Sequence, residues 1–422
     1  PFQEISNHIF SSKSTLFLEN SSFDLNLGYT YNDRKEFEEE HHHGEHDDDH
    51  DDGDEDDDDD DHDEGEEAEH HEEELHPALQ MKLKTFNYDL KYHLPKMGKF
   101  ETIVGLQGMH QTNTNYGEEQ LIPNATTNDF GVLATSHIHF NKIDVQIGAR
   151  FDSRKIKVAN TLSKNFTSFN GALGFKTNLT NNLVARLNIA SGFRAPNLAE
   201  LTSYGSHEGT NRFEVGNQNL KNEQNFQTDL ALEYKTDHLE IFANGFYNTI
   251  NNYIYLSPNG ELMDSDPVFL YLQEDANLYG GEIGLHIHPH PLDWLHIESS
   301  FESVTGKQKN GDYLPLIPAN KIKNTLHVDY QFKPLKSGNA FVTLSSVLSQ
   351  NNTSDFESNT SGYNLLSAGF GGEILVLKNL FKFQFTGTNL TNKKYVNHMS
   401  RLKPDGIYNI GSNFSLSIGY TF

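Results

Sequence analysis

The chain has 422 residues, 35% of them hydrophobic, no cysteine, and a formal net charge of −28 at pH 7. The segment from Glu36 to His76 holds 26 of the acidic residues and no Lys or Arg, so the rest of the chain carries about −2. These numbers exclude disulfide frameworks and thiolate metal sites. They also argue against nucleic acid as a partner, because no basic stripe exists.

Outside the acidic segment, apolar and polar residues alternate in runs of about ten, and no apolar run reaches the length of a membrane helix. From Lys142 to Phe151, one face carries Ile143, Val145, Ile147 and Ala149, while Asp144, Gln146 and Arg150 lie on the other. The same period recurs at Asn170–Thr177 and Ser412–Phe422. A period of two over such lengths predicts a strand with one apolar face. The chain contains roughly 17 such segments.

The predicted connections alternate between short and long along nearly the whole chain. The short ones are Glu19–Ser22, Leu94–Lys99, Asn141, Asn178–Asn182, Thr236–His238, Pro289–Asp293, Lys333–Gly338 and Leu375–Leu380. The long ones are Phe37–His76, Asn113–Asn124, Ala195–Asn222, Ser257–Pro267, Lys307–Ala319, Asn351–Thr360 and Thr391–Ile407. This parity predicts an all-β, antiparallel up-and-down barrel of the transmembrane kind. The last strand then ends on the short-turn rim, which in outer-membrane barrels faces the periplasm, and the acidic segment lies outside the cell.

Several motifs resemble those of TonB-dependent outer-membrane receptors. Ile189–Asn197 (IASGFRAPN) with Glu200-Leu201 is similar to a mid-barrel signature of that family, and Asn217–Glu223 (NQNLKNE) to the stretch that opens its next strand. Further matches are Asn277–Gly284, Leu314–Ala319, Thr388–Tyr395 and the terminal Phe422. The stretch His41–His76 together with Tyr395–Phe414 most resembles receptors for zinc and related metals.

The resemblance implies a barrel of 22 strands filled by an N-terminal plug that contacts the TonB complex. This chain opens within barrel sequence, so residues 1–422 are expected to be the C-terminal part of such a barrel, with the plug missing. About 17 strands could not close alone, because an open edge in outer-membrane lipid leaves backbone groups unpaired.

The acidic segment, taken as a disordered extracellular loop over residues 37–76, carries the candidate metal site. Its proposed ligands are nine histidines and three aspartates: His41, His42, His43, His46, Asp47, Asp49, His50, Asp52, His62, His70, His71 and His76. Neutral imidazole suits zinc, copper and nickel, and carboxylates attract cations over a longer range. Metal binding weakens as imidazoles become protonated below about pH 6.5. The alternative is a solvated acidic surface that binds calcium or nothing.

Other histidines are weaker candidates. His137 and His139, and likewise His286 and His288, are predicted to face the lumen near a periplasmic turn, where they either hold a cation or hydrogen-bond a plug. His207, Glu208 and His398 are expected to be ordinary polar loop residues. The aromatic residues Phe242, Phe246, Tyr253 and Tyr255 are expected to face lipid or the membrane interface.

The sequence thus predicts an outer-membrane receptor that takes up a divalent transition metal as cargo, zinc first, and requires no cofactor. One alternative within the family is a receptor for an iron siderophore, haem or a copper complex. Another, of a different class, is a surface metal-binding module that transports nothing. No grouping of nucleophile, base and orienting residue stands out, so no enzymatic activity is expected.

Overall fold

The computed structural model describes residues 2–37, 77, 79–116, 122–159, 161–207, 212–263, 265–331, 333, 335–376 and 379–421. Within them lie one short helix, α1 (Leu198–Thr202), and nineteen strands of one sheet. The strands are β1 (Phe2–Phe17), β2 (Ser22–Phe37), β3 (Leu79–His93), β4 (Phe100–Asn115), β5 (Ala125–His139), β6 (Ile143–Val158), β7 (Leu162–Asn178), β8 (Leu183–Arg194), β9 (Tyr204–His207), β10 (Arg212–Val215), β11 (Glu223–Lys235), β12 (Leu239–Met263), β13 (Asp266–Ile287), β14 (Leu295–Gln308), β15 (Lys321–Tyr330), β16 (Leu335–Val347), β17 (Tyr363–Val376), β18 (Asn379–Thr388) and β19 (Asn413–Thr421). No helix among the described residues is long and apolar enough to cross a membrane.

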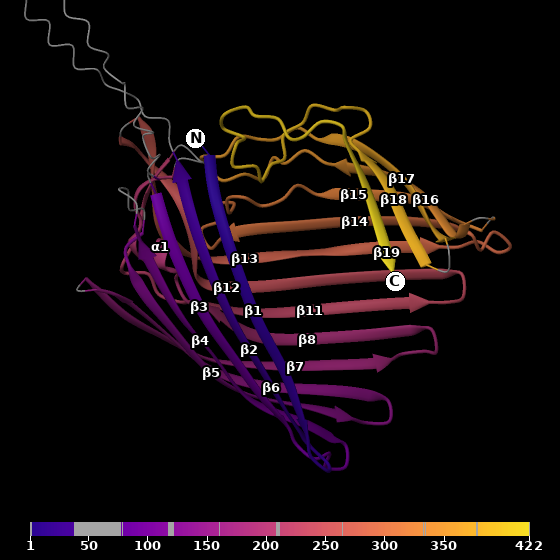
Figure 1. Cartoon of the computed structure of the whole chain (residues 1–422), viewed down its shortest axis with the longest axis horizontal. Coiled ribbons are helices and arrows are strands. Elements are labelled where there is room, and N and C mark those ends of the chain that lie inside the picture. The colour runs from indigo at the N-terminus through magenta and orange to yellow at the C-terminus, as the bar shows by residue number, and fades with distance from the viewer. Residues whose placement is uncertain are drawn as a thin grey trace, which may run out of the picture.

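The sheet is an antiparallel meander in which each strand pairs with the next one along the chain (Figure 1). The single interruption is that β8 pairs directly with β11. Between them, β9 and β10 form a small hairpin, and β10 runs parallel to β13 over three residues. Without this hairpin the wall has 17 strands, which confirms the predicted number and the up-and-down topology.

Short turns occupy one rim and most long connections the other, as predicted, but the long-loop rim also carries a short turn, because β6 ends at Val158 and β7 begins at Leu162. The turns after β1, β5 and β11 lie on one rim, and the connections after β2, β8 and β18 lie on the other. The predicted long loop Ser257–Pro267 is wrong, because β12 and β13 continue as a paired hairpin up to Met263 and Asp266. The prediction took this polar stretch for a loop. A strand that extends beyond the membrane can be polar, because it needs no apolar face.

The two faces of the wall differ as the alternation predicts. On β6, Ile143, Ile147 and Phe151 are exposed on the outer face, while Arg150 and Asp152 point to the inner face. Outward apolar side chains are what a lipid-facing barrel surface requires.

The prediction for Phe242 and Phe246 is wrong. On β12 they alternate with the exposed Ile241 and Tyr247 and therefore lie on the inner face. The Phe242 ring covers Gly284 of β13, with a ring atom 2.2 Å from where a Cβ on that glycine would stand.

The described strands form a partial barrel wall. β1 pairs with β2 and is exposed along its whole length, β19 pairs with β18, and no register in the described part of the chain joins β1 to β19. In Figure 1 the indigo and yellow strands mark these two ends of the meander.

Candidate functional site

The acidic segment is inserted between β2 and β3 on the long-loop rim. These strands pair up to Glu36 and Leu79, so the two ends of the segment leave the wall side by side. Its predicted ligands lie outside the described residues: His41, His42, His43, His46, Asp47, Asp49, His50, Asp52, His62, His70, His71 and His76. The structure therefore defines where this segment is attached.

The connection between β8 and β11 is folded and anchored by a charged triad at the barrel mouth. The Arg194 guanidinium donates to both carboxylate oxygens of Glu223 at 2.9 and 2.6 Å and to both of Glu200 at 2.7 and 2.9 Å. Glu200 also completes a capping box with Asn197 at the start of α1. Paired, bidentate geometry of this kind is strong and directional. The two motifs that resemble the family signature thus meet in space.

A hydrophobic cluster holds the same connection against the wall. Leu201 of α1 is fully buried. It belongs to a cluster that includes Leu220 of the same connection, Ile156 of β6 and Ile254 of β12. Apolar side chains on the inner face at this level are explained by the folded connection that covers them. The mouth therefore has a small core of its own, formed by residues far apart in sequence.

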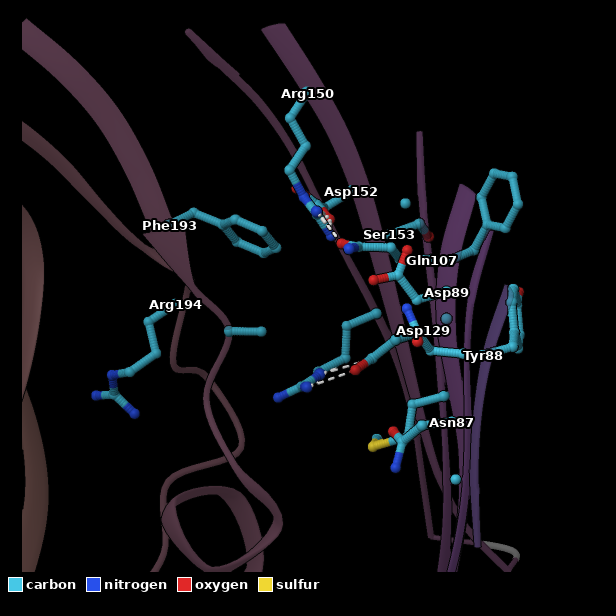
Figure 2. Close-up of a pocket in the computed structure, with 18 of the residues that line it drawn as sticks. Asn87, Tyr88, Asp89, Gln107, Asp129, Arg150, Asp152, Ser153, Phe193 and Arg194 are labelled. Atoms are coloured by element: carbon cyan, nitrogen blue, oxygen red, sulfur yellow. Dashed lines mark hydrogen bonds and ion pairs between the residues drawn. The ribbon is translucent and has the colours of Figure 1, made fainter. Parts of the chain in front are cut away.

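Deeper on the inner wall is an open cavity of about 700 Å³ (Figure 2). Arg150 and Asp152 face one another there, with the Arg150 Nε 2.7 Å from the nearer carboxylate oxygen, and Arg150 also donates to Gln107. Arg154 makes a bidentate pair with Asp129 at 2.7 and 2.6 Å. With Arg194 bound to its two glutamates, each arginine that lines this cavity is already matched by a carboxylate.

His398, in the last long connection, is buried rather than an ordinary polar loop residue, so that expectation is wrong. Its Nδ1 lies 2.8 Å from Thr360 Oγ1 and accepts a hydrogen bond from Lys403 Nζ at 3.1 Å. Burial, and then the charge of Lys403, lower the pKa of His398 below its usual 6.5. An ammonium group at bonding distance makes this ring a poor cation ligand in this arrangement.

Most of the remaining histidines lie on the short-turn rim. Of the 13 histidines outside the acidic segment, nine lie at or within a few residues of the short turns: His93, His137, His139, His238, His286, His288, His290, His296 and His327. Alternation places His286 on the inner face, as predicted, because its neighbours Ile283 and Ile297 are exposed on the outer one.

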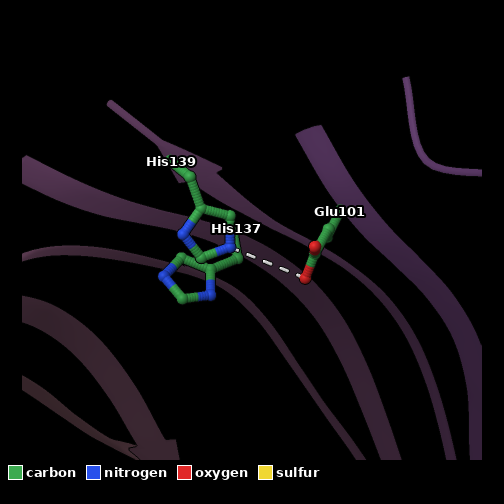
Figure 3. A group of neighbouring side chains, drawn as sticks. All are labelled: Glu101, His137 and His139. Atoms are coloured by element: carbon green, nitrogen blue, oxygen red, sulfur yellow. Dashed lines mark ion pairs between the residues drawn. The ribbon is translucent and has the colours of Figure 1, made fainter. Parts of the chain in front are cut away.

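Two groups of described residues have the donor atoms and spacing for a metal ion. The first joins Glu101 of β4 to His137 and His139 of β5, whose rings lie 4.2 Å apart (Figure 3). His139 is 3.6 Å from Glu101 and 2.8 Å from Asp144. The second joins His238, His288 and Asp293. Sequence reasoning identified the histidine pairs, but it missed the acidic partners and the turn histidines, which only strand register brings near them.

An antiparallel wall with an apolar outer face, a charged inner face and folded connections at one mouth defines an outer-membrane barrel protein. The family model described as TonB dependent receptor-like, beta-barrel matches residues 4–390. The chain therefore belongs to this family, whose members are receptors of the outer membrane. The short turns face the periplasm and the long connections face outward.

Solved structures share the fold at low sequence identity. The copper transporter OprC is 16% identical with a TM-score of 0.73, and the match covers 100% of this chain and 64% of that one. The FrpB iron transporter from Neisseria meningitidis (F5-1 variant) is 12% identical over 99% of this chain and 64% of its own, with a TM-score of 0.70. BauA, the ferric preacinetobactin receptor from Acinetobacter baumannii, is 14% identical over 99% and 63%, with a TM-score of 0.62. The chain thus spans less than two thirds of the length of these neighbours.

Proposed function

We propose that the protein takes up a divalent transition metal ion across the outer membrane, zinc first, and that the acidic segment captures the ion. The observation that carries this proposal is chemical: nine histidines are interleaved with carboxylates in one connection. The β2–β3 register attaches that connection to the long-loop rim, which faces outward. Imidazole and carboxylate donors at the barrel mouth would raise the local concentration of a borderline cation.

The charges on the inner wall favour a cation over an anionic chelate. Arg150, Arg154 and Arg194 are each paired with a carboxylate, so the cavity that they line offers no free positive charge to a siderophore carboxylate or a haem propionate. The absence of cysteine and a total of five methionines also leave few soft ligands for copper(I). Zinc(II), nickel(II) and copper(II) suit the imidazole-rich set better.

Energy coupling through TonB and a plug is part of the proposal, and family membership alone supports it. A second candidate is a receptor for a copper or iron complex, which the copper and iron transporters among the structural neighbours favour. Growth of cells on each metal source would distinguish a zinc receptor from a receptor for a copper or iron complex. A surface module that binds metal without transport would accumulate metal on cells but deliver none to the periplasm.

The test replaces all nine histidines of the segment with asparagine and measures zinc uptake in zinc-limited cells. We expect uptake to fall at low external zinc and to recover at high zinc, because the segment concentrates the ion. The matched control replaces nine carboxylates of the same segment, other than the proposed ligands Asp47, Asp49 and Asp52, with amides and keeps every histidine. Unchanged uptake in the histidine variant, with normal receptor levels, would show that the segment captures no metal.

A further inference from the structure

Six histidines form a continuous array at the periplasmic end of the wall, which we name the rim ladder. Its members come from four segments that strand pairing brings together: His290, His238, His288, His286, His296 and His327. In that order, neighbouring ring centroids are 5.5, 5.4, 5.5, 5.2 and 5.5 Å apart. The ladder follows the short turns at the right-hand ends of β11 to β14 in Figure 1.

A carboxylate stands at each end of the rim ladder. Asp293 lies 3.4 Å from His290 and 3.8 Å from His238, and Asp329 lies 3.3 Å from His296 and 3.4 Å from His327. These acids are half-exposed, and the rings range from partly buried to exposed. Water can therefore reach the array, and the side chains have room to adjust to a bound ion.

Strand register explains why the rings converge. His296 is directly opposite His327, and on the inner face of β13 His286 lies beside them. On the outer face, the residues that alternate with them are apolar and exposed, namely Ile297 and Leu326. The wall thus presents its imidazoles to the aqueous interior instead of to lipid.

The donor geometry fits a zinc-class ion. His286 Nε2 and His296 Nδ1 are 3.0 Å apart, and His296 Nε2 faces Asp329. This carboxylate can accept a hydrogen bond from the Nε2–H, which leaves the Nδ1 lone pair directed toward His286. In the His238, His288 and Asp293 group, the donor atoms lie within 4.8 Å of one another. Ligand atoms around tetrahedral zinc are roughly 3.4 Å apart, given bonds of about 2.0–2.1 Å. Shifts of about 1 Å by these exposed or partly buried side chains would close that group on an ion.

We propose that the rim ladder is a binding site for a zinc-class divalent cation at the periplasmic end of the inner wall. Closely spaced imidazoles with flanking carboxylates bind such ions when the rings are neutral, and they repel one another when the rings are protonated. The role of this site in receiving the ion as it leaves the barrel rests on the proposed function. Zinc binding by the rim ladder does not depend on that function.

The experiment first removes the competing acidic segment. Residues 38–77 are replaced by Asn-Gly in the full-length protein, because the β2–β3 register allows a two-residue hairpin there. The protein is purified in detergent and titrated with zinc by calorimetry and with cobalt(II) by visible absorption, which reports tetrahedral coordination. In this background we compare His238→Asn/His288→Asn and His286→Asn/His296→Asn with the control His8→Asn/His110→Asn, which removes two histidines far from the rim.

We expect zinc binding in the background protein, at least about tenfold weaker binding in either ladder variant, and no change in the control. No zinc binding in the background, or an equal loss in the control, would overturn the proposal. Ladder variants that bind zinc normally but unfold at lower temperature without metal would show a structural hydrogen-bond array, which also overturns it. If zinc uptake does not depend on the histidines of the acidic segment, the proposed function is wrong. Zinc binding at the rim ladder would not be affected by that result.

Discussion

Replacing Arg194 with methionine should release the folded connection between β8 and β11 while the barrel wall stays intact. The change removes four charge-assisted hydrogen bonds of 2.6–2.9 Å and leaves two carboxylates, Glu200 and Glu223, whose side chains are only 10% and 11% exposed. Breaking a buried ion pair by removing one partner costs about 3–5 kcal/mol.

The Arg194 side chain is itself 42% exposed, so solvent can partly compensate for the loss. We therefore expect a cost nearer 2–3 kcal/mol, which raises the open population of the connection roughly 30- to 150-fold. The double variant Arg194→Met/Glu223→Gln should recover part of this, because it removes one uncompensated charge.

The measurement is amide hydrogen exchange across residues 195–222, with exchange in β11 as the internal standard. The matched control is Arg186→Met on the same strand, where Arg186 donates to Glu233 at 3.0 Å and the carboxylate side chain is 31% exposed. A surface pair of this kind contributes about 0–1 kcal/mol. Equal protection in the two variants would refute the view that the triad anchors the mouth.

Three further outcomes are expected. Since His398 has a lowered pKa in the fold, its contribution to stability is present above pH 6.5 and is lost as pH falls through that lowered value, so the exchange protection of the last connection should fall once the pH drops below 6.5. His398→Gln should flatten this profile, and an unchanged profile would contradict the assignment. Leu201→Ala, at a fully buried site, should destabilise the mouth by about 2–5 kcal/mol in denaturant titrations that follow this connection. Gly216→Ala would place a Cβ 2.5 Å from the Thr202 amide nitrogen and should cost about 1–3 kcal/mol by the same assay, whereas a neutral effect would mean that this backbone is loosely packed.

The sequence by itself determined the wall and the chemistry of its most unusual connection. Alternation in runs of about ten residues predicted 17 strands because side-chain direction has a period of two along any strand, whatever lies beside it. The prediction failed where that signal is ambiguous. Both faces of β12 carry apolar side chains near Phe242 and Ile241, so composition could not say which side faces lipid. The tip between Ser257 and Pro267 is polar but still paired.

Only the tertiary structure decided which distant residues meet. Arg194, Glu200 and Glu223 converge because α1 folds back into the mouth, and no local pattern encodes that return. The rim ladder depends on register across β12 to β15, since a slip of one residue would turn His296 and His327 toward lipid. Histidine spacing along the chain identified two inner-face pairs, but the carboxylates beside them are set by pairing between strands. For that reason the metal chemistry of the acidic segment can be predicted from the sequence, whereas that of the rim ladder can be inferred only from the fold.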